Sequence, residues 1–363
     1  TSGVTPTQQG HAPGAKIAFM DVESGSSFSI PYPLGHWMFR IAQDAGAKLH
    51  SNSWGASINY YVPEAADVDK YHYDNEDFLA LFAASNDGSY GYYSVGFPAV
   101  CKNVLTVGAT RTASNMGSMA YFSSMGPTFD GRIKPDISAP GYPTTSAYGN
   151  LTDSDNCAVG QMSGTSMATP AVAGIAATIR QYFENSSFWA STCDGSYSNC
   201  GVLSPKGATV KAVIIHSGDM MTEYSESWLD YYTNEDYSVL GEAPNVYAGF
   251  GKVYMQNVLP VTGIESTIDL FVDEISLDQL TERSYTVVVS DASRPLKTTI
   301  VWMDPANSII SHKMLLHDID LTISTGSGAN QTVWYGNNII GDELNNVEQV
   351  YIETPTAGAT YTV

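Results

Sequence analysis

Ser166 is the residue whose neighbours best suit it to act as a nucleophile. It follows a turn at Gly164 and precedes a run of small apolar residues that ends at residue 177. A helix made of such residues has no polar face and must be buried on nearly all sides, and Pro170 suits its first turn. Ser166 would then lie at the helix N-terminus, where unpaired backbone N–H groups can stabilise an oxyanion. The alternative is that Thr165 or Ser166 only caps the helix.

Residues 164–170 read GTSMATP, which resembles, letter for letter, the nucleophile motif of the subtilisin-like serine proteases. The resemblance extends to earlier segments, which occur in the order typical of the family. Residues 52–55 (NSWG) resemble the strand that pairs with the substrate backbone, residues 83–88 (AASNDG) the oxyanion-hole loop, and residues 95–98 (VGFP) the base of the specificity pocket. Ser85 stands where the family usually has glycine.

The resemblance implies a serine endopeptidase in which Ser166 attacks the scissile carbonyl and Asn86 stabilises the oxyanion. It also implies that seven residues bind the substrate: Ser53, Trp54, Gly55, Ala83, Ala84, Ser85 and Gly96. These segments carry no acidic residue up to Asn86, so a buried lysine or arginine of the substrate would stay unpaired. We therefore expect large apolar or aromatic P1 side chains, with Asp87 at the rim of the pocket.

The catalytic aspartate and histidine motifs of the family have no counterpart in this chain. None of its seven histidines lies in a His-Gly-Thr-His stretch, and His11 falls in the turn that follows the catalytic histidine helix of the family. Both ends of the chain look cut, so we expect a fragment of a longer protease whose upstream part supplies both residues. The chain alone would be almost inert, since subtilisin, a member of this family, loses about 10⁶ in rate without its histidine. The alternative is a pseudoprotease that binds peptides without cleaving them.

The order of apolar segments predicts an α/β fold for residues 1–259, which we assign to an N-terminally incomplete peptidase domain. Strand-like and helix-like segments alternate, which is typical of a parallel sheet with helices on both faces. The predicted strands are residues 16–22, 49–55, 78–84 and 103–110, and the predicted helices are residues 36–47, 64–75 and 210–217. Ligands of such sheets bind at the carboxyl ends of the strands.

Residues 260–363 contain short strand-like runs separated by turns, a pattern typical of an antiparallel β-sandwich or barrel. Several segments resemble the jelly-roll domain of one alkaline subtilase subgroup, and we assign these residues to such a domain, C-terminally incomplete. Five oxygen-bearing residues indicate a structural calcium site: Asp304, Asp318, Asp320, Asn346 and Glu348. Asp318 and Asp320 would share one side of a strand and repel each other unless a cation lies between them. The alternative is a solvated acidic edge.

The formal net charge of −21 is spread along the chain. Such a surface disfavours nucleic acid and anionic membranes as partners, and no apolar stretch is long enough to span a membrane. We expect polypeptide substrates as partners and a monomeric protein.

The four cysteines form no CxxC pair and have no histidine at zinc-ligand spacing. We expect a disulfide between Cys193 and Cys200 and another between Cys101 and Cys157, with buried free thiols as the alternative. Three glycosylation sequons begin at Asn150, Asn185 and Asn330. Cysteines and sequons together favour an extracellular or secretory-pathway location.

Overall fold

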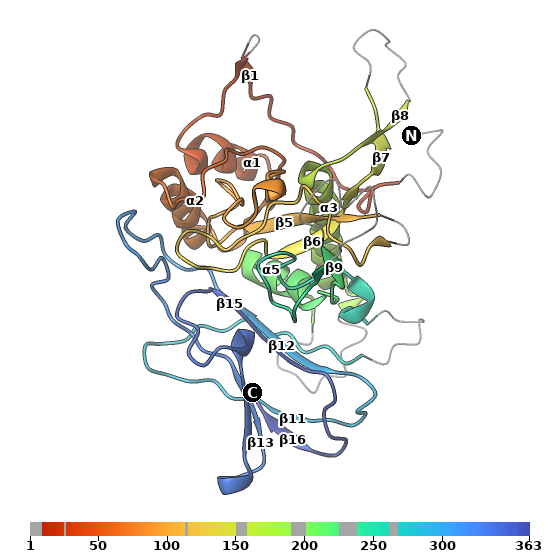
Figure 1. Cartoon of the computed structure of the whole chain (residues 1–363), viewed down its shortest axis with the longest axis vertical. Coiled ribbons are helices and arrows are strands. Elements are labelled where there is room, and N and C mark those ends of the chain that lie inside the picture. Colours follow the sequence, from red (N-terminus) through yellow and green to blue (C-terminus); the bar gives the residue numbers. More distant parts are fainter. Residues whose placement is uncertain are drawn as a thin grey trace.

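Figure 1 shows the computed structural model of the chain, which describes residues 9–24, 27–112, 115–149, 158–189, 201–224, 238–260 and 268–363. Helices, a parallel sheet and three short antiparallel strand pairs occupy the red-to-green part of the chain, and longer antiparallel sheets occupy the blue C-terminal part. No helix within these ranges is both long and apolar enough to cross a membrane.

Four parallel strands form the central sheet, in the order β3-β4-β5-β6. Their bounds are Leu49–Asn52 (β3), Leu79–Ala83 (β4), Leu105–Arg111 (β5) and Ile137–Tyr142 (β6). Leu81 lies opposite Ser51 on one side and Leu105 on the other, so β4 is a central strand. The predicted parallel sheet is confirmed. The sequence pattern did not indicate β6, because it contains Pro140 and Gly141, which strands usually avoid. β6 is an edge strand of the described sheet, where a proline is tolerated.

The strand predicted at residues 16–22 is wrong. This segment is neither helix nor strand, and Ile17 and Phe19 are each 87% exposed. A strand needs a neighbouring strand to complete its backbone hydrogen bonds and a core to bury one of its faces. The segment forms no ladder with any described strand, so its apolar side chains alone did not make it one.

Helices cover both faces of the sheet, as predicted. On one face of β4, Leu79 and Leu81 join the core cluster that includes α3 (Thr165–Glu184) and α5 (Gly207–His216). Ala80 and Phe82 on the opposite face join a second cluster with the short helix η2 and with α2. The bounds on that side are Gly35–Phe39 (η2), Arg40–Asp44 (α1) and Pro63–Asp74 (α2). All five residues of β4 are buried, which places its carboxyl end firmly within the fold.

The C-terminal strands form two antiparallel sheets. One has the order β11-β16-β13-β14 and the other pairs β12 with β15. Their bounds are Thr286–Val288 (β11), Leu296–Val301 (β12), Thr322–Thr325 (β13), Thr332–Tyr335 (β14), Val347–Ile352 (β15) and Thr360–Thr362 (β16). Ile323, Tyr361 and Ile352 meet in one core between the two sheets. The antiparallel architecture is confirmed, and the jelly-roll connectivity stays a prediction.

Short hairpins and single helical turns complete the described structure. The hairpins pair Glu23–Ser24 (β1) with Ser27–Phe28 (β2), Thr144–Ala147 (β7) with Val159–Met162 (β8), and Glu223–Tyr224 (β9) with Ser238–Val239 (β10). The turns are Gly88–Tyr90 (η3), Met255–Asn257 (η5), Gly328–Asn330 (η6) and Gly336–Asn338 (η7).

The β12–β15 ribbon packs on one side against the antiparallel sheet β11-β16-β13-β14 and on the other side against α5. On the side facing α5, Lys297 Nζ donates to the carbonyl oxygens of His216 (3.0 Å) and Gly218 (2.9 Å), at the C-terminal end of the helix. Val347 belongs to the core cluster of the parallel sheet, and Met314 belongs to the cluster on its other face. The apolar cores therefore continue across the predicted boundary at residues 259 and 260, which stays a prediction.

Candidate active site

Ser166 is the second residue of α3, directly after Gly164 and Thr165. The sequence pattern predicted Pro170 in the first turn of this helix, which is wrong. The helix begins at Thr165, so Pro170 lies in its second turn. A proline there has no N–H to donate to the carbonyl four residues earlier, which is that of Ser166. The Ser53 hydroxyl donates to this carbonyl instead, at 2.8 Å. The end of β3 is thereby tied to the first turn of α3.

Asn86 lies three residues beyond β4 and faces the same turn. Its Oδ1 accepts hydrogen bonds from the backbone N–H of Thr165 (2.9 Å) and from the Thr165 hydroxyl (3.0 Å). Two donors on Oδ1 fix the orientation of the side-chain amide, so its Nδ2 is the end that can donate to a ligand. A side chain at Gly164 would come within 3.4 Å of this Nδ2.

A cleft of about 280 Å³ opens beside these residues. It is lined by Ser53, Trp54, Gly55, Ala56, Ser57, Ala83, Ser85, Asn86, Asp87, Thr165 and Ser166. The carboxyl ends of β3 and β4 form two of its walls, as expected for a parallel sheet. Of the residues predicted to bind substrate, only Ala84 and Gly96 are not in the lining.

Ala84 and Gly96 lie directly behind the cleft. Gly96 N–H donates to the Ala84 carbonyl, at 3.3 Å. A side chain at Gly96 would meet the Ser85 hydroxyl at 2.8 Å and the backbone oxygen of Ala56 at 2.3 Å. Only glycine therefore fits this position, and Gly96 supports the cleft wall from behind.

Sequence reasoning missed three lining residues: Ala56, Ser57 and Thr165. The Ser57 hydroxyl donates to the carboxylate of Asp87 at 2.7 Å, which holds this acid beside the cleft. Thr165 could have been found, because it precedes the nucleophile in the motif. Ala56 and Ser57 gave no signal, since their role follows from where the chain turns after β3.

No histidine is among the residues that line the cleft. The His11 carbonyl accepts from the Thr178 hydroxyl (3.2 Å), and the His11 Cβ lies beside Gly174 of α3. Gly174 is eight residues, or roughly 12 Å along the helix, from Ser166. His11 is thus a loop residue packed along α3.

Three other histidines are structural. Burial lowers the pKa of His50 and of His72 to about 4, and that of His216 to about 3. His72 joins α2 to β4, because its Nε2 accepts the Ala80 N–H at 3.0 Å. These side chains are neutral, and none of them lines the cleft.

Cys101 carries a fully buried free thiol, and burial raises its pKa well above the usual value. Cys157, Cys193 and Cys200 lie outside the described residues. The Cys101–Cys157 pairing therefore finds no support from the described structure, and the Cys193–Cys200 pairing stays a prediction.

The structure separates the five residues predicted to bind calcium. Asp304 and Asn346 belong to a network around Lys102 and Asn103, whereas Asp318 and Asp320 act on Glu348. Asp318 and Asp320 precede β13, so the argument that they share one side of a strand is wrong. Within the described ranges, no group of three or more His, Cys, Asp or Glu side chains could hold a metal ion.

Glu348 is the member of this set with an unusual environment. It is 1% exposed, one carboxylate oxygen accepts the Leu321 N–H at 2.7 Å, and the other has no hydrogen-bond partner. Burial, followed by the negative charges of Asp342, Asp320 and Asp318, raises the pKa of Glu348 to about 8. Burial and the neighbouring carboxylates also raise the pKa of Asp320.

Comparison with known proteins identifies related sequences. A family model described as "Subtilase family" matches residues 2–250. Two proteins of Dictyostelium discoideum, described as serine protease/ABC transporter B family proteins tagA and tagB, are 23% and 27% identical to the chain over 96% and 97% of its length. The chain covers 25% and 24% of those proteins, and thus spans about a quarter of their length.

Two prokaryotic proteins are similar to parts of the chain. Pyrolysin of Pyrococcus furiosus is 32% identical over 49% of the chain and 14% of its own length. Serine protease AprX of Bacillus subtilis is 42% identical over 28% of the chain and 26% of its own length. Among solved structures, one titled S41 psychrophilic protease matches with a TM-score of 0.40 and 25% identity over 59% of each chain.

Proposed function

Because the chain belongs to the subtilase family, we propose that it carries the nucleophile and the oxyanion hole of a serine endopeptidase. The observation that supports this most directly is the position of Ser166 in the first turn of α3, beside Asn86 and facing the cleft. A binding protein would need neither this hydroxyl nor an amide held in one orientation. The family follows from the comparisons, and the peptidase activity, the polypeptide substrate and the residue roles are our proposal.

In the proposed reaction, Ser166 Oγ attacks the scissile carbonyl, the C–N bond breaks, and the amine leaves with the proton that Ser166 has given up, so that an acyl-enzyme remains. The negative charge on the carbonyl oxygen is stabilised by Asn86 Nδ2 and by the backbone N–H of Ser166, which lies at the positive end of α3. A histidine must take the proton from Ser166, and an aspartate must orient that histidine. We propose that both come from the full-length protein outside these 363 residues.

We propose that the cleft accepts a large apolar or aromatic P1 side chain. Its walls at Ala83, Gly55 and Trp54 are uncharged, and Gly96 leaves the wall behind Ser85 without a side chain. Discrimination among such residues should be loose, since one methylene is worth only about 1–3 kcal/mol. Asp87 at the rim would admit some basic residues. A peptide library with a strict preference for arginine or lysine at P1 would contradict this assignment.

The alternative is a peptide-binding pseudoprotease. The observation in its favour is that the residues lining the cleft include no histidine. The two functions differ in a single reaction, because only an activated serine is labelled covalently by a fluorophosphonate.

The test uses the full-length protein and a fluorophosphonate probe. We expect labelling at Ser166 and its loss in Ser166→Ala. Asn86→Ala should lower kcat by about 10²–10³ with little change in KM, because the amide binds charge that develops in the transition state. A folded protein that is not labelled would establish the pseudoprotease instead.

Two further expectations stay proposals. We propose calcium binding by the five predicted residues from the sequence alone, since the arrangement of the described side chains does not support it; equal melting temperatures in chelator and in millimolar calcium would exclude it. We also propose a secretory-pathway location, since the sequon residues Asn185 and Asn330 are both exposed. Glycan mapping at these residues tests it.

A further inference from the structure

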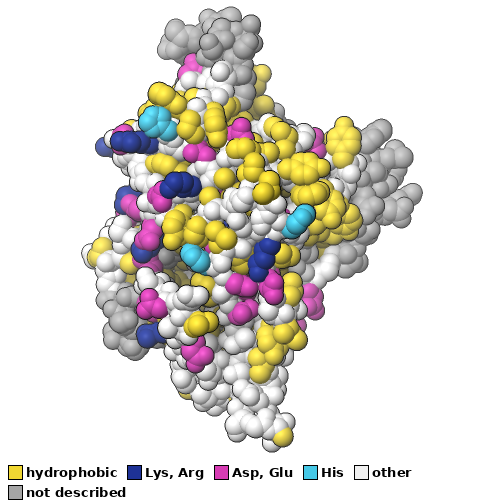
Figure 2. Space-filling view, turned by 90° about the vertical axis from the view of Figure 1, so that its left-hand side faces the viewer, with side chains coloured by type: hydrophobic (Ala, Val, Ile, Leu, Met, Phe, Trp, Pro, Cys, Tyr) yellow, Lys and Arg dark blue, Asp and Glu magenta, His cyan; other side chains and the backbone are white. Residues whose placement is uncertain are grey.

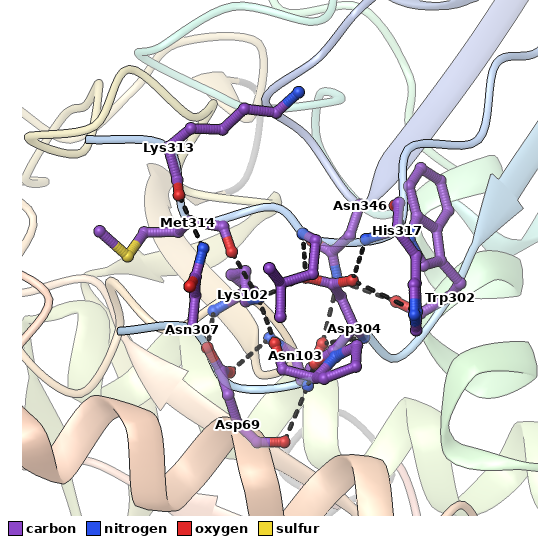
Figure 3. A network of polar contacts seen from close by, with 12 residues as sticks. Asp69, Lys102, Asn103, Trp302, Asp304, Asn307, Lys313, Met314, His317 and Asn346 are labelled. Carbon is purple, nitrogen blue, oxygen red and sulfur yellow. Dashed lines mark hydrogen bonds and ion pairs between the residues drawn. The ribbon is translucent and has the colours of Figure 1, made fainter. Parts of the chain in front are cut away.

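Lys102 and Asp304 form a fully buried ion pair between distant parts of the chain. Lys102 lies just before β5, and Asp304 lies in the loop that follows β12 (Figure 3). The Lys102 ammonium also donates to the carbonyl oxygens of Pro305 (2.6 Å) and Met314 (2.8 Å). These three acceptors use all three of its N–H groups.

Asp304 is equally saturated. Its carboxylate accepts the N–H groups of Leu316 (3.0 Å) and His317 (2.8 Å) in addition to Lys102. The loop between β12 and β13 therefore surrounds the Asp304 carboxylate and holds it in contact with Lys102. A buried pair of this kind tolerates the loss of one partner poorly, because the remaining charge is left without a counter-ion.

Asn103 repeats the connection at the next position. Its Nδ2 donates to the Asp304 carbonyl at 2.8 Å, and its Oδ1 accepts from the Asp304 N–H at 2.9 Å and from Asn346 Nδ2 at 3.1 Å. On the other side, both Lys102 and Asn103 donate their backbone N–H to Asp69 of α2. Residues 102 and 103 are thus fixed between the peptidase part and the C-terminal part (Figure 3).

A single tight turn joins Lys102 to the cleft. Within it, the Val100 N–H donates to the Gly96 carbonyl at 3.2 Å and the Cys101 N–H donates to the Pro98 carbonyl at 3.0 Å. At the other end of the turn, the Phe97 carbonyl accepts the N–H of Ala56, a residue of the cleft lining, at 2.8 Å. A shift of Lys102 would therefore move the backbone that supports the cleft wall.

We propose that Asp304 is a positioning residue for substrate selection. Through Lys102 it holds the turn at residues 96–101, and this turn fixes the wall of the cleft that receives the P1 side chain. The C-terminal part of the chain thereby takes part in specificity without touching the substrate. The proposal rests on the proposed function, because a P1 side chain exists only if the cleft binds a peptide substrate.

The test compares variants of the full-length protein on two peptides that differ only in phenylalanine or alanine at P1. In Asp304→Asn, measured below its melting transition, the ratio of kcat/KM for the two peptides should fall by about tenfold. Most of this change should come from KM for the phenylalanine peptide, because the chemistry at Ser166 is untouched. If this variant does not fold, the double variant Lys102→Met/Asp304→Leu is used, because it removes both charges. It should lower the ratio of kcat/KM for the two peptides to a similar extent.

Lys297→Met is the matched control. Lys297 also joins the C-terminal part to the peptidase part, but its acceptors are the His216 and Gly218 carbonyls at the end of α5. We expect a lower melting temperature with the P1 ratio unchanged. An unchanged ratio in the Asp304 and double variants, or an equal change in Lys297→Met, would overturn the proposal.

Labelling of the wild type by a fluorophosphonate is measured first, and its absence contradicts the proposed function alone. The positioning role is then tested by the Kd values of the same two peptides. A tenfold narrower Kd ratio in Asp304→Asn supports the role, and an equal ratio in wild type and variant rejects it.

Discussion

Among single residues, Ser85 has the most unusual backbone at the site. Its φ angle is +93°, in a region that residues with a side chain rarely adopt. The strain lies in the loop between β4 and Asn86. A serine there costs on the order of 1–3 kcal/mol, which the surrounding structure has to offset.

Ser85→Gly should therefore stabilise the protein by about 0.5–1 kcal/mol, the relief of strain being partly cancelled by the greater freedom of glycine in the unfolded chain. Urea unfolding measures this change. Ser85→Ala is the control, because it keeps the strained angle and should bring no gain. Equal stabilities of the glycine and alanine variants would show that the angle carries no strain.

Glu348 should make stability depend on pH in a defined direction. Its pKa is raised from the usual value of 4.5 to about 8, so the folded state keeps a proton that the unfolded state has lost. The contribution is fully present below pH 4.5, falls by up to about 1.4 kcal/mol per pH unit as the pH rises, and is lost above pH 8.

In chelator, Glu348→Gln should thus gain stability over the wild type at pH 8 relative to pH 5, by on the order of 2–4 kcal/mol. Urea unfolding at the two pH values measures the difference. Glu343→Gln, at an exposed acid paired with Lys313, should show almost none. A pH-independent difference for Glu348→Gln would mean that its carboxyl group titrates normally.

The positions of Ser166 and Asn86 beside one cleft were predictable, because the sequence around each is specific, and their roles stay proposals. Residue roles in general can be predicted only where the local sequence decides them. They were not predictable where a distant partner decides the role. Asp304 carries the type of side chain that binds calcium, and only the position of Lys102, two hundred residues away in the chain, makes it one half of an ion pair.

At the scale of elements, the site depends on how α3 begins. Pro170 deprives the Ser166 carbonyl of its helical donor, and the Ser53 hydroxyl from the end of β3 replaces it. The helix that carries the nucleophile is therefore attached to the strand that forms a cleft wall.

This exchange predicts a coupling between the two positions. Ser53→Ala should cost about 1 kcal/mol in the wild type, because it leaves the Ser166 carbonyl without its donor. It should cost clearly less in a Pro170→Ala background, where residue 170 supplies an N–H. A double-mutant cycle of unfolding free energies measures the coupling, and additive costs would refute the exchange.

Elements were predictable from sequence where local pattern and burial agree. Residues 78–84 are almost wholly apolar, and the strand β4 lies in the middle of the sheet. Residues 16–22 have a similar composition, but no neighbour among the described strands pairs with them, and pairing is not visible in a local pattern. The helix α3 was predictable, but its predicted burial on nearly all sides is wrong, because Pro170 and Thr178 are exposed. Its predicted start was also wrong by about one turn.

At the scale of the whole molecule, the two predicted domains share their cores. Val347 and Met314 of the C-terminal part lie in the two clusters that cover the faces of the parallel sheet. On the side of the molecule shown in Figure 2, acidic, basic and apolar side chains are interspersed, and the basic ones form no continuous patch.

A chain that ends at residue 259 should accordingly not fold cooperatively. It would expose the α5 side of the core and leave the buried Lys102 without its counter-ion. Calorimetry should show one transition for the 363-residue chain and none that is sharp for the shorter one. A cooperative transition in the shorter chain would establish an independent peptidase domain.

The contact between Asn103 and Asn346 also bears on inheritance. A recombination event near residue 260 would join a peptidase segment from one ancestor to a β-sandwich from another, and each would bring amides and charges shaped for a different counterpart. Hybrids of that kind would be removed by selection unless residues 102, 103, 304 and 346 were replaced together. In the lineage of this protein, the two segments should therefore share a single phylogenetic history.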